Sequence, residues 1–146
     1  MENKEFRKVF DSIAQKYGFE AAFDGWFKES DECIIVLELQ KSNFGNYYEL
    51  NIKTFIQGMF GISYSKNKNL VKKDMGPLLM RPPNEYKDVL SLDLQVKNEQ
   101  RMERLEKLFN DFIVPYTDKT LTRAGIRELA ENGLFLLPAV KKELGI

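Results

Sequence analysis

Two neighbouring stretches of the chain carry the side chains whose types and spacing are best suited to chemistry. Glu38 and Gln40 alternate with apolar residues in the run CIIVLELQ, and Glu49, Asn51 and Lys53 alternate in the run YYELNIK. In a β-strand every second side chain points to the same face of the sheet. Carboxylates that meet on one face can raise one another's pKa for acid–base catalysis, or hold a hard cation between them. The spacing therefore predicts a polar patch with the groups for either kind of chemistry.

A loop over residues 41–46 would join these two strands into a hairpin. The register that aligns their apolar residues sets Glu38 opposite Glu49 and Gln40 opposite Tyr47. Two like charges directly opposed on a sheet cost up to about 1 kcal/mol unless a neighbouring cation or a bound ion compensates, or unless both are solvated and splay apart. The prediction is one shared sheet face for Glu38, Gln40, Glu49, Asn51 and Lys53.

Hydrophobic periodicity indicates the elements that must position these strands. Apolar residues spaced by three and four predict a core-packing helix over residues 6–17, which Gly18 ends. Residues 26–40 predict a hairpin, and its second strand has one face that begins apolar at Ile34 and Val36 and ends polar. We therefore expect one end of the sheet to be covered on both faces and the other end to be open.

The second half of the chain predicts one more clear strand and three helices. Residues 89–96 alternate regularly and are the cleanest strand pattern, residues 60–64 suggest another short strand, and the lysine-rich stretch 65–77 reads as a mobile loop. The expected helices run from an Asn98 cap to Pro115, from Thr120 or Thr122 to just before Gly133, and from near Pro138 to Gly145. This order predicts a single α+β domain over residues 1–146: an N-terminal helix, an antiparallel sheet of about four to five strands, and C-terminal helices packed on the sheet.

Composition excludes several classes of function. The chain has 22 basic and 22 acidic residues, so it lacks the positive charge that attracts nucleic acid or anionic lipid. It has no histidine, which removes every mechanism that needs imidazole, and its one cysteine, Cys33, begins an apolar run typical of a buried, inert thiol. No glycine-rich phosphate loop, metal-ligand cluster, signal peptide or membrane-spanning run is present, so we expect a cytoplasmic protein without cofactor or metal.

Five segments carry a resemblance to a known family: KYGF, WFKES, IIVLELQKSNFGN, YYELNI and LEKLFNDFIVPYTDK. Together they resemble a bacterial family known as domain of unknown function 4304, and the similarity covers most of the chain. Its most specific part is Gln40, Lys41, Ser42, Gly45 and Asn51, whereas Lys53 and Thr54 stand where the family often has glycine. The resemblance implies an α+β fold and no established activity.

Three functions compete at this point. The first is a non-enzymatic binding domain that engages a protein partner, with neutralisation of that partner as one form of this function. Its candidate aromatic anchors are Phe44, Tyr47 and Tyr48, of which Tyr48 is better explained as core. The second is a metal-dependent phosphodiesterase or nuclease, and the third is a small-molecule enzyme that uses Glu38 and Glu49. The binding domain is the preferred hypothesis, and its candidate surface consists of Glu38, Gln40, Lys41, Ser42, Phe44, Tyr47, Glu49, Asn51 and Lys53.

Overall fold

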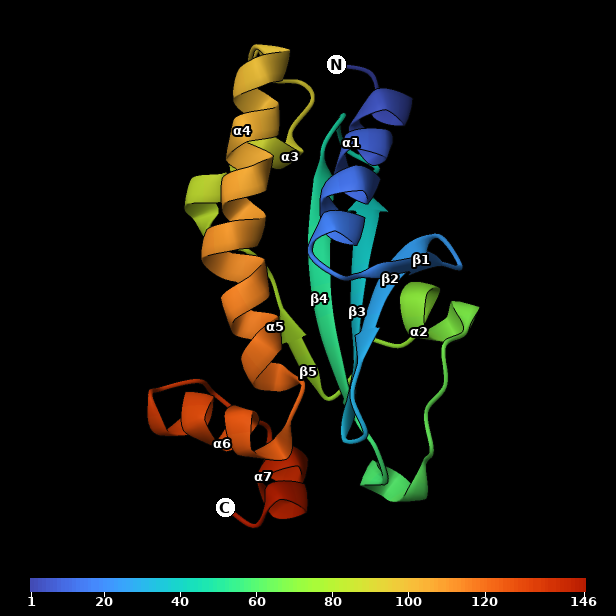
Figure 1. Ribbon diagram of the computed structural model, residues 1–146, viewed down its shortest axis with the longest axis vertical. Coiled ribbons are helices and arrows are strands. Elements are labelled where there is room, and N and C mark those ends of the chain that lie inside the picture. Colours follow the sequence, from blue (N-terminus) through green and yellow to red (C-terminus); the bar gives the residue numbers. More distant parts are fainter.

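An antiparallel sheet of five strands in chain order is the centre of the computed structural model, which describes residues 1–146 (Figure 1). A helix precedes the sheet in the chain and further helices follow it, so the predicted α+β class is confirmed. The alternating runs form the longest strands, and two short edge strands complete the sheet. The strands are β1 (Glu20–Ala22), β2 (Gly25–Glu29), β3 (Cys33–Lys41), β4 (Tyr48–Ile56) and β5 (Leu78–Met80).

The pairing between β3 and β4 keeps the predicted faces but not the predicted partners. Glu38 pairs with Asn51 and Gln40 pairs with Glu49, a slip of two residues from the expected register. Because side chains alternate with a period of two, such a slip leaves every side chain on its face, and the apolar pattern fits both registers. The observed register puts an amide, rather than a second carboxylate, opposite Glu38. The shared polar face is thus confirmed, and the direct opposition of Glu38 and Glu49 is wrong.

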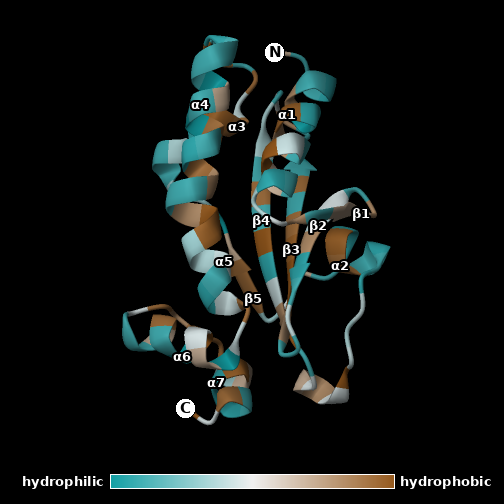
Figure 2. Ribbon diagram, viewed as in Figure 1, coloured by the Kyte–Doolittle hydropathy of each residue, from teal (hydrophilic) through white to brown (hydrophobic).

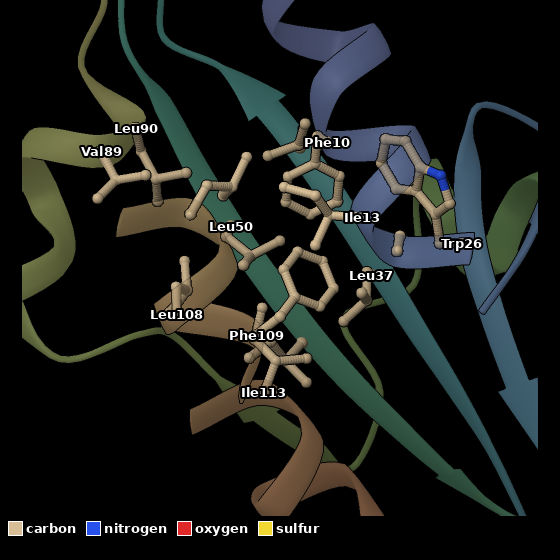
Figure 3. Packing of buried hydrophobic residues seen from close by; sticks show 14 of the residues in the cluster. Phe10, Ile13, Trp26, Leu37, Leu50, Val89, Leu90, Leu108, Phe109 and Ile113 are labelled. Carbon is tan, nitrogen blue, oxygen red and sulfur yellow. The ribbon is translucent and has the colours of Figure 1, made fainter. Parts of the chain in front are cut away.

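The apolar face of β3 and β4 packs against α1 (Asn3–Lys16) and a long helical segment made of α4 (Asn98–Leu108), a π-helical turn (Phe109–Ile113) and α5 (Val114–Thr120) (Figure 1). Phe109 lies in the middle of this core, with its ring centroid 5.1 Å from that of Phe10. Each fully buried side chain of this size contributes roughly 1.5–3 kcal/mol. Figure 3 shows the two layers meeting through Phe10, Ile13, Leu37, Leu50, Leu108, Phe109 and Ile113.

The long helix runs through Pro115, where the sequence predicted its end. In an α-helix the proline ring would clash with the carbonyl group four residues earlier. The turn before Pro115 is π-helical instead: Val114 N donates to Phe109 O, five residues back, and this wider turn accommodates the ring. The hydroxyl of Thr117 donates to Ile113 O at 2.7 Å and satisfies one of the carbonyl groups near the distortion.

The other helix ends follow local sequence signals. Gly18 has φ of 90° after α1, and Gly145 has φ of 72° after α7 (Pro138–Leu144). The Thr122 side chain accepts a hydrogen bond from Gly125 N at the start of α6 (Arg123–Glu131). Asn98 differs from expectation: it is the first residue of α4, and Lys97 occupies the cap position.

The opposite face of the sheet is covered at one end by α2 (Lys68–Lys72), inside the stretch predicted to be a mobile loop. Asn67 Oδ1 accepts from Leu70 N and caps this short helix, and Leu70 and Val71 pack on Ile34 and Val36. The apolar beginning of that face is therefore covered, as expected. The predicted strand at 60–64 is wrong: a 3₁₀ turn (Met59–Gly61) is followed by irregular chain, and no neighbouring strand pairs with it.

The predicted strand at 89–96 is also wrong. Its first residues belong to α3 (Lys87–Leu90), and turns follow. Arg101, which is 2% exposed, donates to the carbonyl groups of Asp88, Val89, Ser91 and Leu94. A strand ladder would need those same carbonyl groups, so the buried guanidinium folds the segment into a helix and turns instead.

A third cluster of buried side chains closes the end of the sheet beside α6 and α7. Cys33 lies in it, fully buried, and burial raises the pKa of its thiol to about 12. The expectation of a buried thiol is confirmed.

Figure 2 shows hydrophobic residues along the central strands and hydrophilic ones over much of α4. None of the helices combines the length and the apolar character that crossing a membrane requires.

Candidate functional site

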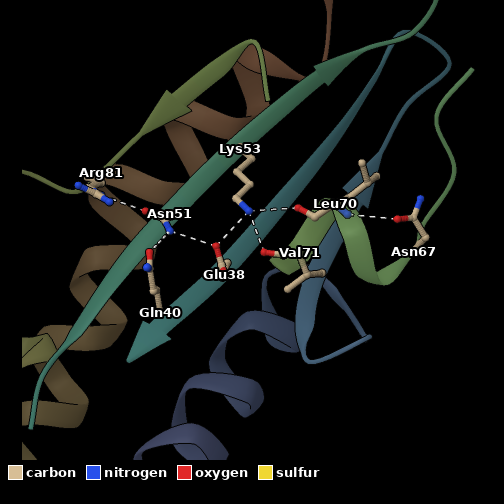
Figure 4. Close-up of polar contacts among 8 residues, drawn as sticks. All are labelled: Glu38, Gln40, Asn51, Lys53, Asn67, Leu70, Val71 and Arg81. Carbon is tan, nitrogen blue, oxygen red and sulfur yellow. Dashed lines mark hydrogen bonds and ion pairs between the residues drawn. The ribbon is translucent and has the colours of Figure 1, made fainter. Parts of the chain in front are cut away.

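Lys53 is the centre of a buried polar network on the sheet face that α2 partly covers. Its side chain is fully buried, and its Nζ lies 3.0 Å from Glu38 Oε1, 3.2 Å from Leu70 O and 2.7 Å from Val71 O (Figure 4). These two carbonyl groups belong to the end of α2, where a helix leaves its carbonyl groups without partners. An ammonium group has three N–H donors, so the three acceptors use all of them. Lys53 therefore ties α2 to the sheet.

Asn51 extends the network toward the open end of the sheet. Its Nδ2 donates to Glu38 Oε1 and to Gln40 Oε1, both at 3.0 Å. Its Oδ1 accepts from Arg81 Nε at 2.9 Å (Figure 4). Asn51 is fully buried, so each of these hydrogen bonds replaces one that water would otherwise supply.

This network limits the chemistry of the predicted face. Glu38 is 7% exposed, and one of its oxygens holds both Lys53 and Asn51. Glu49 is half-buried and pairs with Gln40, two residues further along β3 than its predicted partner Glu38. No three His, Cys, Asp or Glu side chains are grouped as a metal site would need. The carboxylates are thus arranged as one internal ion pair and one separate surface group.

Arg81 connects the network to a cavity of about 590 Å³, because it binds Asn51 and also lines the cavity. The cavity lies between the start of β4, the Arg81–Pro82–Pro83 connection and α3. Arg81 has a side chain that is 49% exposed, and Asn51 is the only hydrogen-bond acceptor that its guanidinium reaches. The remaining lining residues are Tyr47, Tyr48, Glu49, Leu50, Asn84, Tyr86, Lys87, Leu90, Ser91 and Leu94.

The α3 wall of the cavity is held in place by Arg101. Its four hydrogen bonds end on carbonyl groups of residues 88–94, which include Ser91 and Leu94 of the lining. Burial lowers the pKa of Arg101 and Asp88 opposes that effect, but an arginine stays protonated in proteins. In the same wall, burial raises the pKa of Tyr86, which keeps its hydroxyl neutral.

The loop over residues 42–47 borders the same end of the sheet. Four hydrogen bonds order it: Ser42 N to Tyr47 O, Phe44 N to Ser42 Oγ, Asn46 N to Asp93 Oδ2 and Leu92 N to Asn46 O. Gly45 packs so closely that a Cβ there would lie 2.9 Å from Asp93 Oδ2. The Phe44 side chain is nevertheless 94% exposed. An ordered backbone thus presents a bare aromatic ring to solvent.

The structure divides the predicted surface residues into three groups. Glu38, Asn51 and Lys53 are buried in the network, and Gln40 caps it from the exposed side. Tyr47 and Glu49 line the cavity. The third group lies outside both and consists of Lys41, at the end of β3, and the loop residues Ser42 and Phe44. Tyr48 is 5% exposed and belongs to the core, as expected.

A family comparison gives the chain its place among known proteins. The family model described as a domain of unknown function (DUF4304) matches residues 10–119. The chain belongs to this family. The DUF4304 match runs from α1 into α5 and therefore contains the sheet, the buried network, the cavity and the loop. Comparisons with curated proteins and with solved structures found no match.

Sequence reasoning missed Arg81, Lys87 and Arg101. Arg81 stands before two prolines, which marks a rigid connection but does not indicate a contact with Asn51, 30 residues earlier. Arg101 looked like one of several charges on the outer side of α4. It lies four residues before Leu105 and seven before Leu108, both buried, so helical spacing puts it on the inner stripe, and this spacing is the signal that could have found it. The backbone carbonyl groups that it binds leave no trace in the side-chain pattern.

Proposed function

We propose that the protein is a non-enzymatic binding domain that engages a protein partner through the 42–47 loop. The observation that carries this proposal is Phe44, 94% exposed on a loop whose backbone is held by four hydrogen bonds. Leu94, 51% exposed, and Tyr47 provide further apolar surface nearby, and Lys41 and Ser42 supply a polar rim. Interfaces commonly combine an aromatic anchor with such a rim.

The order of the loop matters for affinity. A loop that is already fixed loses little conformational entropy when a partner binds. Burying a phenylalanine side chain contributes roughly 1.5–3 kcal/mol. Phe44 can therefore supply most of its transfer free energy to association, provided that the partner offers an apolar pocket for the ring.

The state of the buried network supports binding over catalysis. A nuclease or a carboxylate enzyme on this face would need Glu38 to be available to a metal ion or substrate, but its oxygen accepts from Lys53 and Asn51. Glu49 lies on the cavity wall, with its Oε2 4.0 Å from Arg81 Nε. We also propose that the protein acts in the cytoplasm, where an unpaired cysteine such as Cys33 stays reduced.

The test compares Phe44→Ala with Phe135→Ala. Phe135 is 79% exposed in the segment between α6 and α7, at the other end of the molecule (Figure 1). It is the control for nonspecific binding by an exposed aromatic ring. The wild-type chain is used to capture partners from the parent cell, and the recovered partner is then purified and titrated by calorimetry with the wild type and with each variant. Phe44→Ala should weaken its affinity about 30-fold, as loss of an interface hot spot does, and Phe135→Ala should leave it unchanged. Equal binding by Phe44→Ala would refute the assigned surface.

A further inference from the structure

The cavity beside the loop contains an arginine whose orientation is set by the protein and whose outer donors are free. Arg81 Nε donates to Asn51 Oδ1 at 2.9 Å, and Asn51 is itself held by Glu38 and Gln40. The two terminal amino groups of the guanidinium make no hydrogen bond within the protein, although Arg81 lines the cavity. Such a planar fork matches an oxyanion with two parallel hydrogen bonds. Its preorganisation removes part of the entropic cost of binding.

The charges around the cavity select the kind of anion. Among its 13 lining residues, only Arg81, Lys87 and Glu49 are charged, which leaves one net positive charge. Glu49 Oε2 lies 4.0 Å from Arg81 Nε, too far for a hydrogen bond, and so does not occupy the fork. A monoanion neutralises this site, whereas a phosphate dianion would add to the negative charge of Glu49.

The remainder of the lining selects the body of the ligand. Pro82, Pro83, Leu50, Leu90 and Leu94 give the cavity apolar walls, and tyrosine rings add to them. Its volume of about 590 Å³ is within the range of pockets that enclose a small molecule. We propose that this cavity binds a small organic monocarboxylate with an apolar body, with the carboxylate on the terminal amino groups of Arg81 and near Lys87. The cavity shares Tyr47 and Leu94 with the surface proposed for the protein partner but does not include Phe44, so Phe44→Ala distinguishes the failure of one proposal from the failure of the other.

The experiment is an NMR titration of the ¹⁵N-labelled full chain with hexanoate and benzoate, with inorganic phosphate as the competing class of anion. Both carboxylates should give saturable shifts of the Arg81 Nε–H signal and of the Ser91 amide, and phosphate should bind about tenfold more weakly. Phe44→Ala should titrate like the wild type. No saturable shift with either carboxylate, or equal binding of phosphate, would overturn the proposal.

Two variants locate the binding and a third serves as the matched control. Arg81→Gln should weaken carboxylate binding about tenfold or more, and Lys87→Gln, whose side chain makes no hydrogen bond in the fold, should weaken it severalfold without disturbing the network. Arg7→Gln removes an equal charge from a different surface, next to Trp26, and should bind like the wild type. If Arg81→Gln unfolds, Lys87→Gln alone decides: unchanged affinity in that variant refutes the assigned site.

Discussion

Replacing Lys53 with methionine is the most direct test of the buried network. Methionine keeps most of the length and the apolar stem of the side chain but removes the ammonium group. Glu38 then loses its cation at 3.0 Å, and Leu70 O and Val71 O lose their donor. Removing one partner of a buried ion pair costs about 3–5 kcal/mol, because the other charge is left uncompensated. That is a large share of a total stability of about 5–15 kcal/mol.

The assay is urea unfolding followed by circular dichroism, with Lys68→Met as the control. Lys68 is exposed at the start of α2, so its loss should change the free energy of unfolding by less than about 0.5 kcal/mol. In a double-mutant cycle, Glu38→Gln removes the buried charge while its amide oxygen can still accept from Asn51 Nδ2. The double variant should therefore be more stable than the sum of the single losses predicts, by about 1–3 kcal/mol.

Two results would refute this reasoning. A loss in Lys53→Met no larger than in Lys68→Met would show that the ammonium does not hold α2 on the sheet. Strict additivity in the cycle would show that Lys53 and Glu38 are not coupled, and that water rather than protein solvates them. A changed denaturant dependence in the single variant would instead indicate that α2 detaches before the sheet unfolds.

Two further predictions concern groups far from the network. Arg101→Met should destabilise the fold by about 3 kcal/mol or more, since it leaves buried carbonyl groups of residues 88–94 without donors. Amide hydrogen exchange in residues 88–94 should accelerate in this variant but not in the exposed control Lys107→Met. Unchanged protection of residues 88–94 in Arg101→Met would contradict the role assigned to Arg101. Burial raises the pKa of the Cys33 thiol from 9.0 to about 12, so the unfolded chain releases this proton first and stability falls as the pH rises from 9 to 12. Cys33→Val should lose stability over that range less steeply, by up to about 1.4 kcal/mol per pH unit, and identical slopes would show that the thiol is not desolvated.

Much of the fold follows from local patterns in the sequence. The apolar stripe of α1, the hairpin of β2 and β3, and the Thr122 and Gly145 signals of the last helices are each formed by residues within a few positions of one another. Such patterns depend on hydrophobic periodicity and backbone conformation, which neighbouring residues set. The shared polar face also followed from the strand period, because that period does not depend on register.

The failures occur where distant groups compete with a local pattern. Residues 89–96 alternate as a strand does, but Arg101 binds carbonyl groups 7 to 13 residues earlier and imposes α3 and its turns. A proline such as Pro115 usually ends a helix. Here the packing of Phe109 in the core keeps the helix in place, and a π-helical turn accommodates the proline ring. In both cases tertiary contacts outweigh a preference worth a few kcal/mol at most.

The candidate site shows the same division. The sequence by itself determined which side chains share a face, that Cys33 is buried, and that no imidazole chemistry is available. Only the tertiary structure decided that Lys53 is buried and binds α2 to the sheet, and that Arg81 rather than a carboxylate pair faces the cavity. The physical reason is that a buried charge needs partners, and only the packed chain brings them within hydrogen-bond distance. One partner of Lys53 is the backbone carbonyl of Val71, 18 residues away, and no side-chain pattern in the sequence reveals it.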